Sequence, residues 1–356
     1  MYKWLQLLES VDLPSESQVT YIWGAGNTSR LAHQGMLREN LYQEFHIAGY
    51  LDRKTAGGQL NGYPVSHPEI LKSVSKETVF IMISTAYLSV YTEISNTLNE
   101  LGIKHCLLDA AILKVRTDEV KEAIKLLDGV SQEVFCRLLE KRITLEPIES
   151  DLVVGESYFG IPEFCYQRPN EVIVDCGAYV GDTAERFLWR LPLIKRIICI
   201  EPEAGNYRAL CQRLQRLHRE WNCNDEMLVP ICAGIDRETK KLSITNEENG
   251  IAAIQAQDVL EGSNKVYFWS IDDLLAANHW GEVTYIKADI ESFEYNMILG
   301  AKKTIRQFRP RMAICIYHSA VDMFSIPLLI HKISPDYKLS VRHHSYGILE
   351  TVLYVY

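Results

Sequence analysis

The sequence has no long apolar run, no excess of basic residues and no C-x-x-C cysteine pair. No stretch approaches the roughly 18 consecutive apolar residues of a transmembrane helix, so we expect no membrane partner. The formal net charge is -9 at pH 7. A nucleic-acid-binding surface needs a basic field, so we expect no nucleic-acid partner either. The N-terminal segment lacks the apolar core and the cleavage site of a signal peptide.

The nine cysteines are scattered along the chain and odd in number. Disulfide frameworks and zinc sites use paired, regularly spaced cysteines, so this pattern indicates reduced thiols. We therefore expect a cytoplasmic protein with no zinc site.

The order of the predicted elements indicates an α/β chain. Strands and helices alternate along residues 1–115 and again along residues 151–356, whereas residues 116–150 are charged and have helical periodicity. A chain of 356 residues suits two domains. We predict two Rossmann-like domains joined by a helical linker. The two apolar segments at the C-terminal end predict an antiparallel hairpin that closes a mostly parallel sheet.

Two glycine-rich turns follow predicted strands, one in each domain. "VIVDCGAYVGDT" covers residues 172–183 and "YIWGAGNTSR" covers residues 21–30. Asp175 precedes the glycines of the second-domain turn, where its charge repels a phosphate and attracts an ammonium. S-adenosylmethionine carries an ammonium and no phosphate, so the charge favours this cofactor over NAD at the turn.

The next strands supply further candidate donor contacts. Glu201 ends the strand "RIICIE", and its two carboxylate oxygens match the two hydroxyls of a ribose. Small residues at 233–234 leave room for adenine. The predicted donor site comprises Asp175, Gly177, Ala178, Tyr179, Gly181, Asp182, Thr183, Glu201, Pro202, Ala233, Gly234 and Asp289.

Residues 171–356 resemble the FkbM family of S-adenosylmethionine-dependent methyltransferases. The likeness rests on segments such as "VIVDCGAYVGDT", "ICIEPEAGNY" and "YIKADIESFEYNMILGAKKTI", which occur in the expected order. It implies a Rossmann-like methyltransferase fold and O-methylation of a hydroxyl on a small molecule such as a sugar or a secondary metabolite. One departure is Ser292, which replaces the glycine of the family's D-[V/I]-E-G-x-E segment. If the backbone has a positive φ at this position, serine is strained there.

Three side chains are candidates for the reacting side. Asp289, Glu291 and His318 follow predicted strands, and the carboxyl ends of parallel strands share one rim of the sheet. Any of the three can accept the proton of a hydroxyl nucleophile. Asp289 has the alternative role of contacting the donor. We predict no metal, although an acid–acid–His group is also a ligand set for a divalent ion.

The first-domain turn remains a candidate second nucleotide site, with Gly24, Gly26, Asn27 and Asp52 as its residues. No acid precedes its first glycine, so a phosphate is tolerated there. Three readings stay open: a bound dinucleotide, a sugar-nucleotide or other acceptor-holding role, and a structural or docking domain. The alternatives to a methyltransferase are an NAD- or sugar-nucleotide-dependent enzyme and a non-catalytic binding protein. The expected partners are a small-molecule acceptor and, as a further possibility, a second copy of the chain.

Overall fold

The structure is a computed structural model that describes residues 2–166, 168–191, 193–224, 226–245, 253–255 and 265–356. It divides into two compact units whose segments alternate along the chain. Unit 1 contains Met1–Val154, Ile316–Leu328 and Val341–Thr351, and unit 2 contains Gly155–Cys315, Leu329–Ser340 and Val352–Tyr356. The helices of the predicted linker, α6 (Thr117–Lys125) and α7 (Gly129–Thr144), lie in unit 1.

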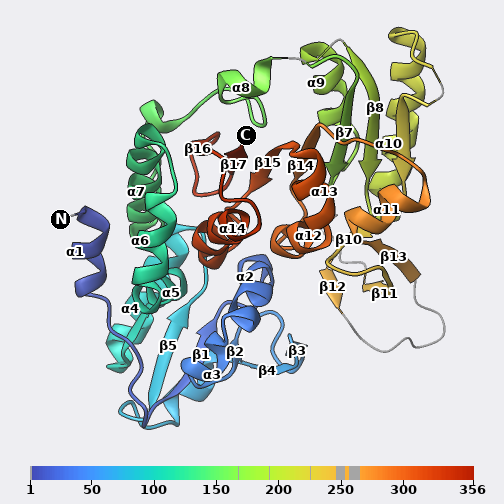
Figure 1. Ribbon diagram of the computed structural model, residues 1–356. Helices are drawn as coiled ribbons and strands as arrows, with labels where there is room; N and C mark the ends of the chain where they lie inside the picture. The colour runs from blue at the N-terminus through green and yellow to red at the C-terminus, as the bar shows by residue number, and fades with distance from the viewer. Residues whose placement is uncertain (1, 167, 192, 225, 246–252, 256–264) are drawn as a thin grey trace. The chain divides into compact units, whose positions relative to one another are not determined.

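Unit 1 is built on a six-stranded sheet with the order β3-β4-β2-β1-β5-β6 (Figure 1). Its strands are β1 Val19–Trp23, β2 Ile47–Leu51, β3 Gln59–Leu60, β4 Tyr63–Ser66, β5 Val79–Ile83 and β6 His105–Leu107. All neighbours are parallel except β3 and β4. The all-apolar sequence of β5 agrees with its complete burial, as expected for a central parallel strand.

Helices connect these strands. They are α1 Lys3–Glu9, α2 Asn27–Arg38, α3 Leu41–Glu44, α4 Leu88–Leu101 and α5 Leu108–Val115, followed by α6 and α7, with a 3-10 turn at Pro68–Lys72. The helix α4 ends at Gly102, whose φ of +67° suits the left-handed cap that glycine favours.

Unit 2 contains a seven-stranded sheet with the order β16-β17-β15-β14-β7-β8-β9 (Figure 1). Its strands are β7 Glu171–Cys176, β8 Ile194–Ile200, β9 Leu228–Ile231, β14 Tyr285–Ala288, β15 Arg311–Cys315, β16 Leu339–His343 and β17 Thr351–Val355. The strands from β15 to β9 pair in parallel, and β17 pairs antiparallel with β15. The prediction of a mostly parallel sheet closed by antiparallel strands is confirmed.

A four-stranded sheet with the order β10-β13-β11-β12 is a separate part of unit 2. Its strands are β10 Gly234–Ile235, β11 Lys240–Thr245, β12 Ala253–Gln255 and β13 Lys265–Trp269. The apolar segment of residues 227–235 predicts one strand, and this prediction is wrong, because the chain leaves the large sheet after Ile231 and pairs again in this smaller one. The sequences of residues 241–246 and 252–257 also predict strands, and parts of these segments lie outside the described residues.

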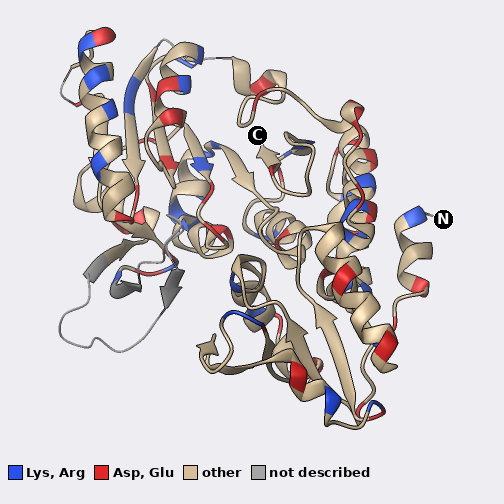
Figure 2. Ribbon diagram, turned by 180° about the vertical axis from the view of Figure 1, so that it is seen from behind, with Lys and Arg blue, Asp and Glu red and all other residues tan. Residues whose placement is uncertain are grey.

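The remaining helices flank and connect these strands. They are α8 Pro162–Cys165, α9 Asp182–Arg190, α10 Ala204–Glu220, α11 Ile271–Ala277, α12 Glu294–Gly300, α13 Lys302–Phe308 and α14 Ala320–Ile333, with a 3-10 turn at Ser150–Leu152. Figure 2 shows charged residues of both signs mainly along helices, whereas the strands are mostly uncharged. Among the described helices, none has the length and apolar character needed to cross a bilayer.

Each large sheet has one point where its strand order reverses direction along the chain. In unit 1 this point lies between β1 and β5, and in unit 2 it lies between β7 and β14. Open α/β sheets bind ligands beyond the carboxyl ends of the strands at such points. Both glycine-rich turns of the sequence follow a strand at this position.

Candidate active site

The glycine turn of unit 2 is shaped by packing against the neighbouring strand end. Gly177 has a φ of +76°, and a Cβ added to it would lie 1.9 Å from the backbone oxygen of Asp289. The N–H groups of Gly177 and Ala178 both donate to the backbone oxygen of Ile200, at 3.0 and 2.9 Å. The contact between the two strand ends therefore requires glycine at position 177.

The carboxylate of Asp175 is engaged by a residue that the sequence analysis did not assign. Asp175 is completely buried, and its Oδ1 lies 3.1 Å from the Nζ of Lys287 on β14. Lys287 also donates to the backbone oxygen of Gly177 at 2.7 Å. Burial lowers the pKa of Lys287, but the carboxylates of Asp175 and Asp289 raise it above its usual value, so the ammonium stays charged.

Two half-buried carboxylates, Asp182 and Asp289, accompany this ion pair. Asp182 is the first residue of α9, and Asp289 directly follows β14. Both lie near enough to Asp175 to act on it electrostatically. The three carboxylates outnumber the single ammonium of Lys287, which leaves a negative charge that favours a cation over a phosphate at the turn. Among these carboxylates, Asp175 is the one paired with Lys287.

Glu201 sits at the carboxyl end of β8 with its carboxylate fixed by two backbone groups. The N–H of Tyr179 donates to Oε2 at 3.0 Å, and the N–H of Glu203 donates to Oε1 at 2.9 Å. Burial raises the pKa of Glu201, whereas these hydrogen bonds lower it. Each oxygen keeps one further acceptor position, which fits the two adjacent hydroxyls of a ribose.

The remaining predicted donor contacts differ in exposure. Tyr179 is 55% exposed, Ala178 and Thr183 are buried, and Pro202 is half-buried. Gly181 has a φ of +83°, and a Cβ there would lie 2.9 Å from the Leu210 side chain.

Ala233 and Gly234 do not provide open space. A Cβ on Gly234 would lie 2.1 Å from the ring of Phe268, and Ala233 is buried. The ring of Phe268 therefore fills the side of Gly234 where a Cβ would lie, and the contact of these two small residues with adenine stays a prediction.

Tyr158 is a site residue that the sequence analysis missed. Its hydroxyl donates to Oδ2 of Asp289 at 3.0 Å, and its ring centroid lies 5.3 Å from the Nζ of Lys287. Tyr158 lies outside the regular elements, and no pattern in "GESYFGIPEF" marks it. It links the loop before α8 to the acid and the ammonium of the site.

The turn after Asp289 is held in an unusual backbone conformation. Glu291 and Ser292 have φ values of +53° and +74°. The buried carboxylate of Glu294 accepts the backbone N–H of Ile290 at 2.7 Å and closes this turn. The position where the family has glycine therefore has the positive φ that glycine accommodates, and a serine there is strained.

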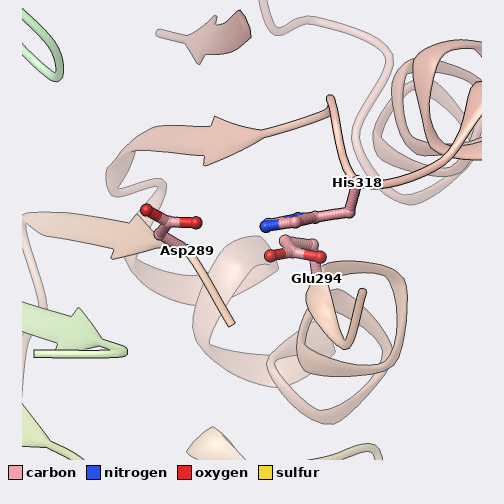
Figure 3. A group of neighbouring side chains, drawn as sticks. All are labelled: Asp289, Glu294 and His318. Carbon is pink, nitrogen blue, oxygen red and sulfur yellow. The ribbon is translucent and has the colours of Figure 1, made fainter. Parts of the chain in front are cut away.

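His318 is buried and lies three residues beyond the end of β15. Figure 3 shows its side chain together with those of Asp289 and Glu294. His318 belongs to unit 1, whereas Asp289 and Glu294 belong to unit 2. Within unit 2, Glu291 is exposed and Glu294 is buried.

The glycine turn of unit 1 has the same construction with different charges. Gly24 has a φ of +120°, and a Cβ there would lie 2.5 Å from the backbone oxygen of Ser84, which follows β5. Asp52 accepts the N–H of Ala25 at 3.3 Å. The helix α2 begins at Asn27, and its capping position is Gly26, which has no side chain to cap the helix.

Comparisons with known proteins agree with this description. Residues 175–333 match the family model described as "Methyltransferase FkbM domain". No curated protein matches the chain. The crystal structure of a methyltransferase FkbM from Methylobacillus flagellatus KT is 18% identical, covers 99% of this chain and 98% of its own, and has a TM-score of 0.58. That likeness supports the fold.

A second solved structure is more distant. Fibrillarin from Aeropyrum pernix, with natively bound S-adenosyl-L-methionine, is 13% identical over 53% of this chain and 67% of its own, with a TM-score of 0.33. The family match confirms the predicted family and its cofactor, S-adenosylmethionine. Residues 175–333 of the chain form an FkbM methyltransferase domain.

Proposed function

We propose that the chain transfers a methyl group from S-adenosylmethionine to a hydroxyl of a small molecule such as a sugar or a secondary metabolite. One observation carries the proposal: half-buried acids and the fixed Glu201 carboxylate surround a glycine turn at the reversal point of the unit 2 sheet. A sulfonium cofactor supplies an electrophilic methyl group and needs no metal to release it. The protein's task is to hold the donor and to take a proton from the acceptor.

Donor binding uses the acids of the turn. Glu201 accepts the ribose hydroxyls through the acceptor positions that the two backbone N–H groups leave open. Asp182 attracts the amino group, while Lys287 neutralises the buried Asp175. A change at Asp182 should therefore affect donor binding more than stability, because Asp182 is half-buried. A change at Asp175 should also affect stability, because Asp175 is part of the core.

Proton removal is assigned to Asp289, with His318 as the competing base. Tyr158 donates to Oδ2 of Asp289 and helps to hold this carboxylate in place for the acceptor's hydroxyl. As the methyl–oxygen bond forms and the methyl–sulfur bond breaks, the hydroxyl proton passes to this carboxylate. A positioned base contributes about 10²–10⁴-fold to such a step.

Calorimetry and kinetics test the two roles separately. Asp182→Asn should weaken S-adenosylhomocysteine binding about tenfold, the effect of losing one charge-assisted contact, with little change in stability. Asp289→Asn should lower kcat by about 10²-fold or more, and the pH profile of His318→Ala shows whether the histidine shares the step. If Asp289→Asn, Glu291→Gln and His318→Ala all keep the wild-type kcat, proton removal by these residues is refuted. A wild-type protein that binds the donor analogue but transfers no methyl group to any hydroxyl compound would be a binding protein.

A further inference from the structure

The carboxyl edge of the unit 1 sheet is built like the donor site of unit 2. In both units, the first glycine of the turn has a positive φ, and a backbone oxygen at the end of the adjacent strand lies where its Cβ would be. In both, an acid after the next strand accepts a backbone N–H from the turn: Glu201 from Tyr179, and Asp52 from Ala25. The same construction at the same reversal point indicates a second ligand site.

The two edges differ in the number of acidic residues near the turn. The first turn of α9 contains Asp182 and Glu185, whereas the first turn of α2 contains no acid. The position of the buried Asp175 has no acidic counterpart before Gly24, where Ile22 and Trp23 precede the turn. The start of α2 therefore presents backbone N–H groups with no acid in its first turn, and the carboxylate near this turn is that of Asp52.

Ser84 gives an independent indication of a ligand. It follows β5 directly, beside Gly24, and is 9% exposed. Its hydroxyl is buried and has no hydrogen-bond partner among the described residues. A buried hydroxyl without a partner is costly, and a phosphate oxygen beside it would satisfy the donor.

Two further features suit a nucleotide. Asp52 keeps an acceptor position for a ribose hydroxyl, since Oδ1 accepts the N–H groups of Lys54 and Thr55 and Oδ2 accepts that of Ala25. Tyr87 and Leu88 begin α4 just beyond Ser84, and they are 67% and 42% exposed. Such exposed apolar side chains offer a surface on which a base can lie.

We propose that unit 1 binds a nucleoside diphosphate group between the carboxyl ends of β1 and β5, with its phosphates at the start of α2 and on Ser84 and its ribose at Asp52. The group can come from a dinucleotide or from a nucleotide sugar. This site is separate from the donor site of unit 2 and does not depend on the proposed methyl transfer.

Titration calorimetry of the full chain with NAD, ADP, UDP-glucose and GDP-mannose tests the site, and S-adenosylhomocysteine serves as the reference ligand for unit 2. We expect at least one of the four nucleotides to bind in a 1:1 ratio, also in the presence of the reference ligand. The nucleotide that binds distinguishes a dinucleotide from a nucleotide sugar. If none of the four binds with a Kd below about 1 mM, the proposal is wrong.

Gly26→Asp is the decisive variant. A Cβ at Gly26 has no atom within 4 Å, and its φ of -90° suits any residue, so the variant should fold. Its carboxylate caps the helix and should weaken nucleotide binding about 10²-fold by repulsion and competition for the N–H groups. The reference ligand should bind as before. Gly129→Asp, which adds the same charge at the start of α7, should change neither affinity.

Ser84→Ala provides the second test. The variant removes a hydroxyl without a protein partner, so it should keep its stability and lose about threefold to tenfold in nucleotide affinity. Equal nucleotide affinity in Gly26→Asp and the wild type would overturn the proposal. If the wild-type chain does not bind S-adenosylhomocysteine, the proposed function is refuted, whereas the proposal of a nucleotide site in unit 1 still stands.

Discussion

Ser292 occupies a backbone position that suits glycine. Its φ is +74°, and its hydroxyl is buried without a hydrogen-bond partner among the described residues. Replacing it with glycine removes both the Cβ strain and the unsatisfied hydroxyl. We expect Ser292→Gly to raise the free energy of unfolding by about 1 kcal/mol, measured by urea denaturation.

Ser292→Ala is the matched control for this change. Alanine removes the hydroxyl but keeps the Cβ, so it should be less stable than the glycine variant. If alanine were the more stable of the two, strain at this position would not explain the effect.

The buried ion pair between Asp175 and Lys287 should contribute to the free energy of unfolding. Removing one partner leaves an uncompensated buried charge, so Lys287→Met should lower the free energy of unfolding by about 3–5 kcal/mol. The double variant Asp175→Asn/Lys287→Met removes both charges and should recover part of the loss, as measured by denaturation of all four proteins. Additive losses in the double variant would show that the pair is not coupled.

Because of this ion pair, weaker donor binding in an Asp175 variant would not by itself show that Asp175 contacts the donor. Such a protein loses a buried carboxylate that holds Lys287, and Lys287 donates to the backbone of the glycine turn. Weaker donor binding would then follow from a displaced turn. Asp182→Asn is the cleaner test of charge attraction, because Asp182 is half-buried.

Among the elements, the hairpin of β16 and β17 contains two adjacent histidines, one bonded within the hairpin and the other bonded to Val154. His343 contacts Thr351 Oγ1 at 2.9 Å and the backbone oxygen of Gly347 at 2.7 Å, and His344 donates to the backbone oxygen of Val154 at 2.7 Å. Both rings are thus structural members of this hairpin. Burial lowers the pKa of His344 to about 4.

This pKa predicts loss of stability in mild acid. The folded value lies below the ordinary value of about 6.5, so protonation favours the unfolded chain. The contribution of His344 is present above pH 6.5 and should be lost as the pH falls from 6.5 to 4, by about 3 kcal/mol at most. His344→Gln retains an N–H donor that does not titrate, so its unfolding free energy should fall less over this range. Parallel curves for the two proteins would contradict the assignment.

The site residues that could be predicted from the sequence lie in the strand–turn–helix elements. Each glycine turn has a local signature, so the turn at Gly177 and the acid at Glu201 were located from neighbouring residues. Lys287 and Asp175 are 112 positions apart, and they meet only because β14 pairs with β7. Tyr158 has no local pattern at all. The positive φ at Ser292 could be anticipated only from the glycine that the family has at this position, because serine itself does not indicate a positive φ.

At the scale of the whole molecule, the two units are not two consecutive stretches of chain. Ile316–Leu328 leaves the β15 strand of unit 2 and belongs to unit 1. Arg142 donates to the backbone oxygen of Tyr317, and Arg38 Nη2 lies 3.1 Å from Asp322 Oδ1. A Cβ on Gly35 would lie 2.8 Å from the Cβ of Val321. Unit 1 is therefore completed by residues that follow the methyltransferase strands.

This interleaving predicts that the chain cannot be divided cleanly between its two glycine turns. A fragment of residues 1–154 lacks the segment that packs on Gly35, and a fragment of residues 155–356 exposes it, so each should denature at a lower temperature than the full chain. Within the full chain, Gly35→Ala should lower the free energy of unfolding by about 1–3 kcal/mol through overpacking. Gly129→Ala is the control, because a Cβ at this helical position has no atom within 4 Å. Fragments as stable as the full chain, together with a neutral Gly35→Ala, would show that the segment is dispensable to unit 1.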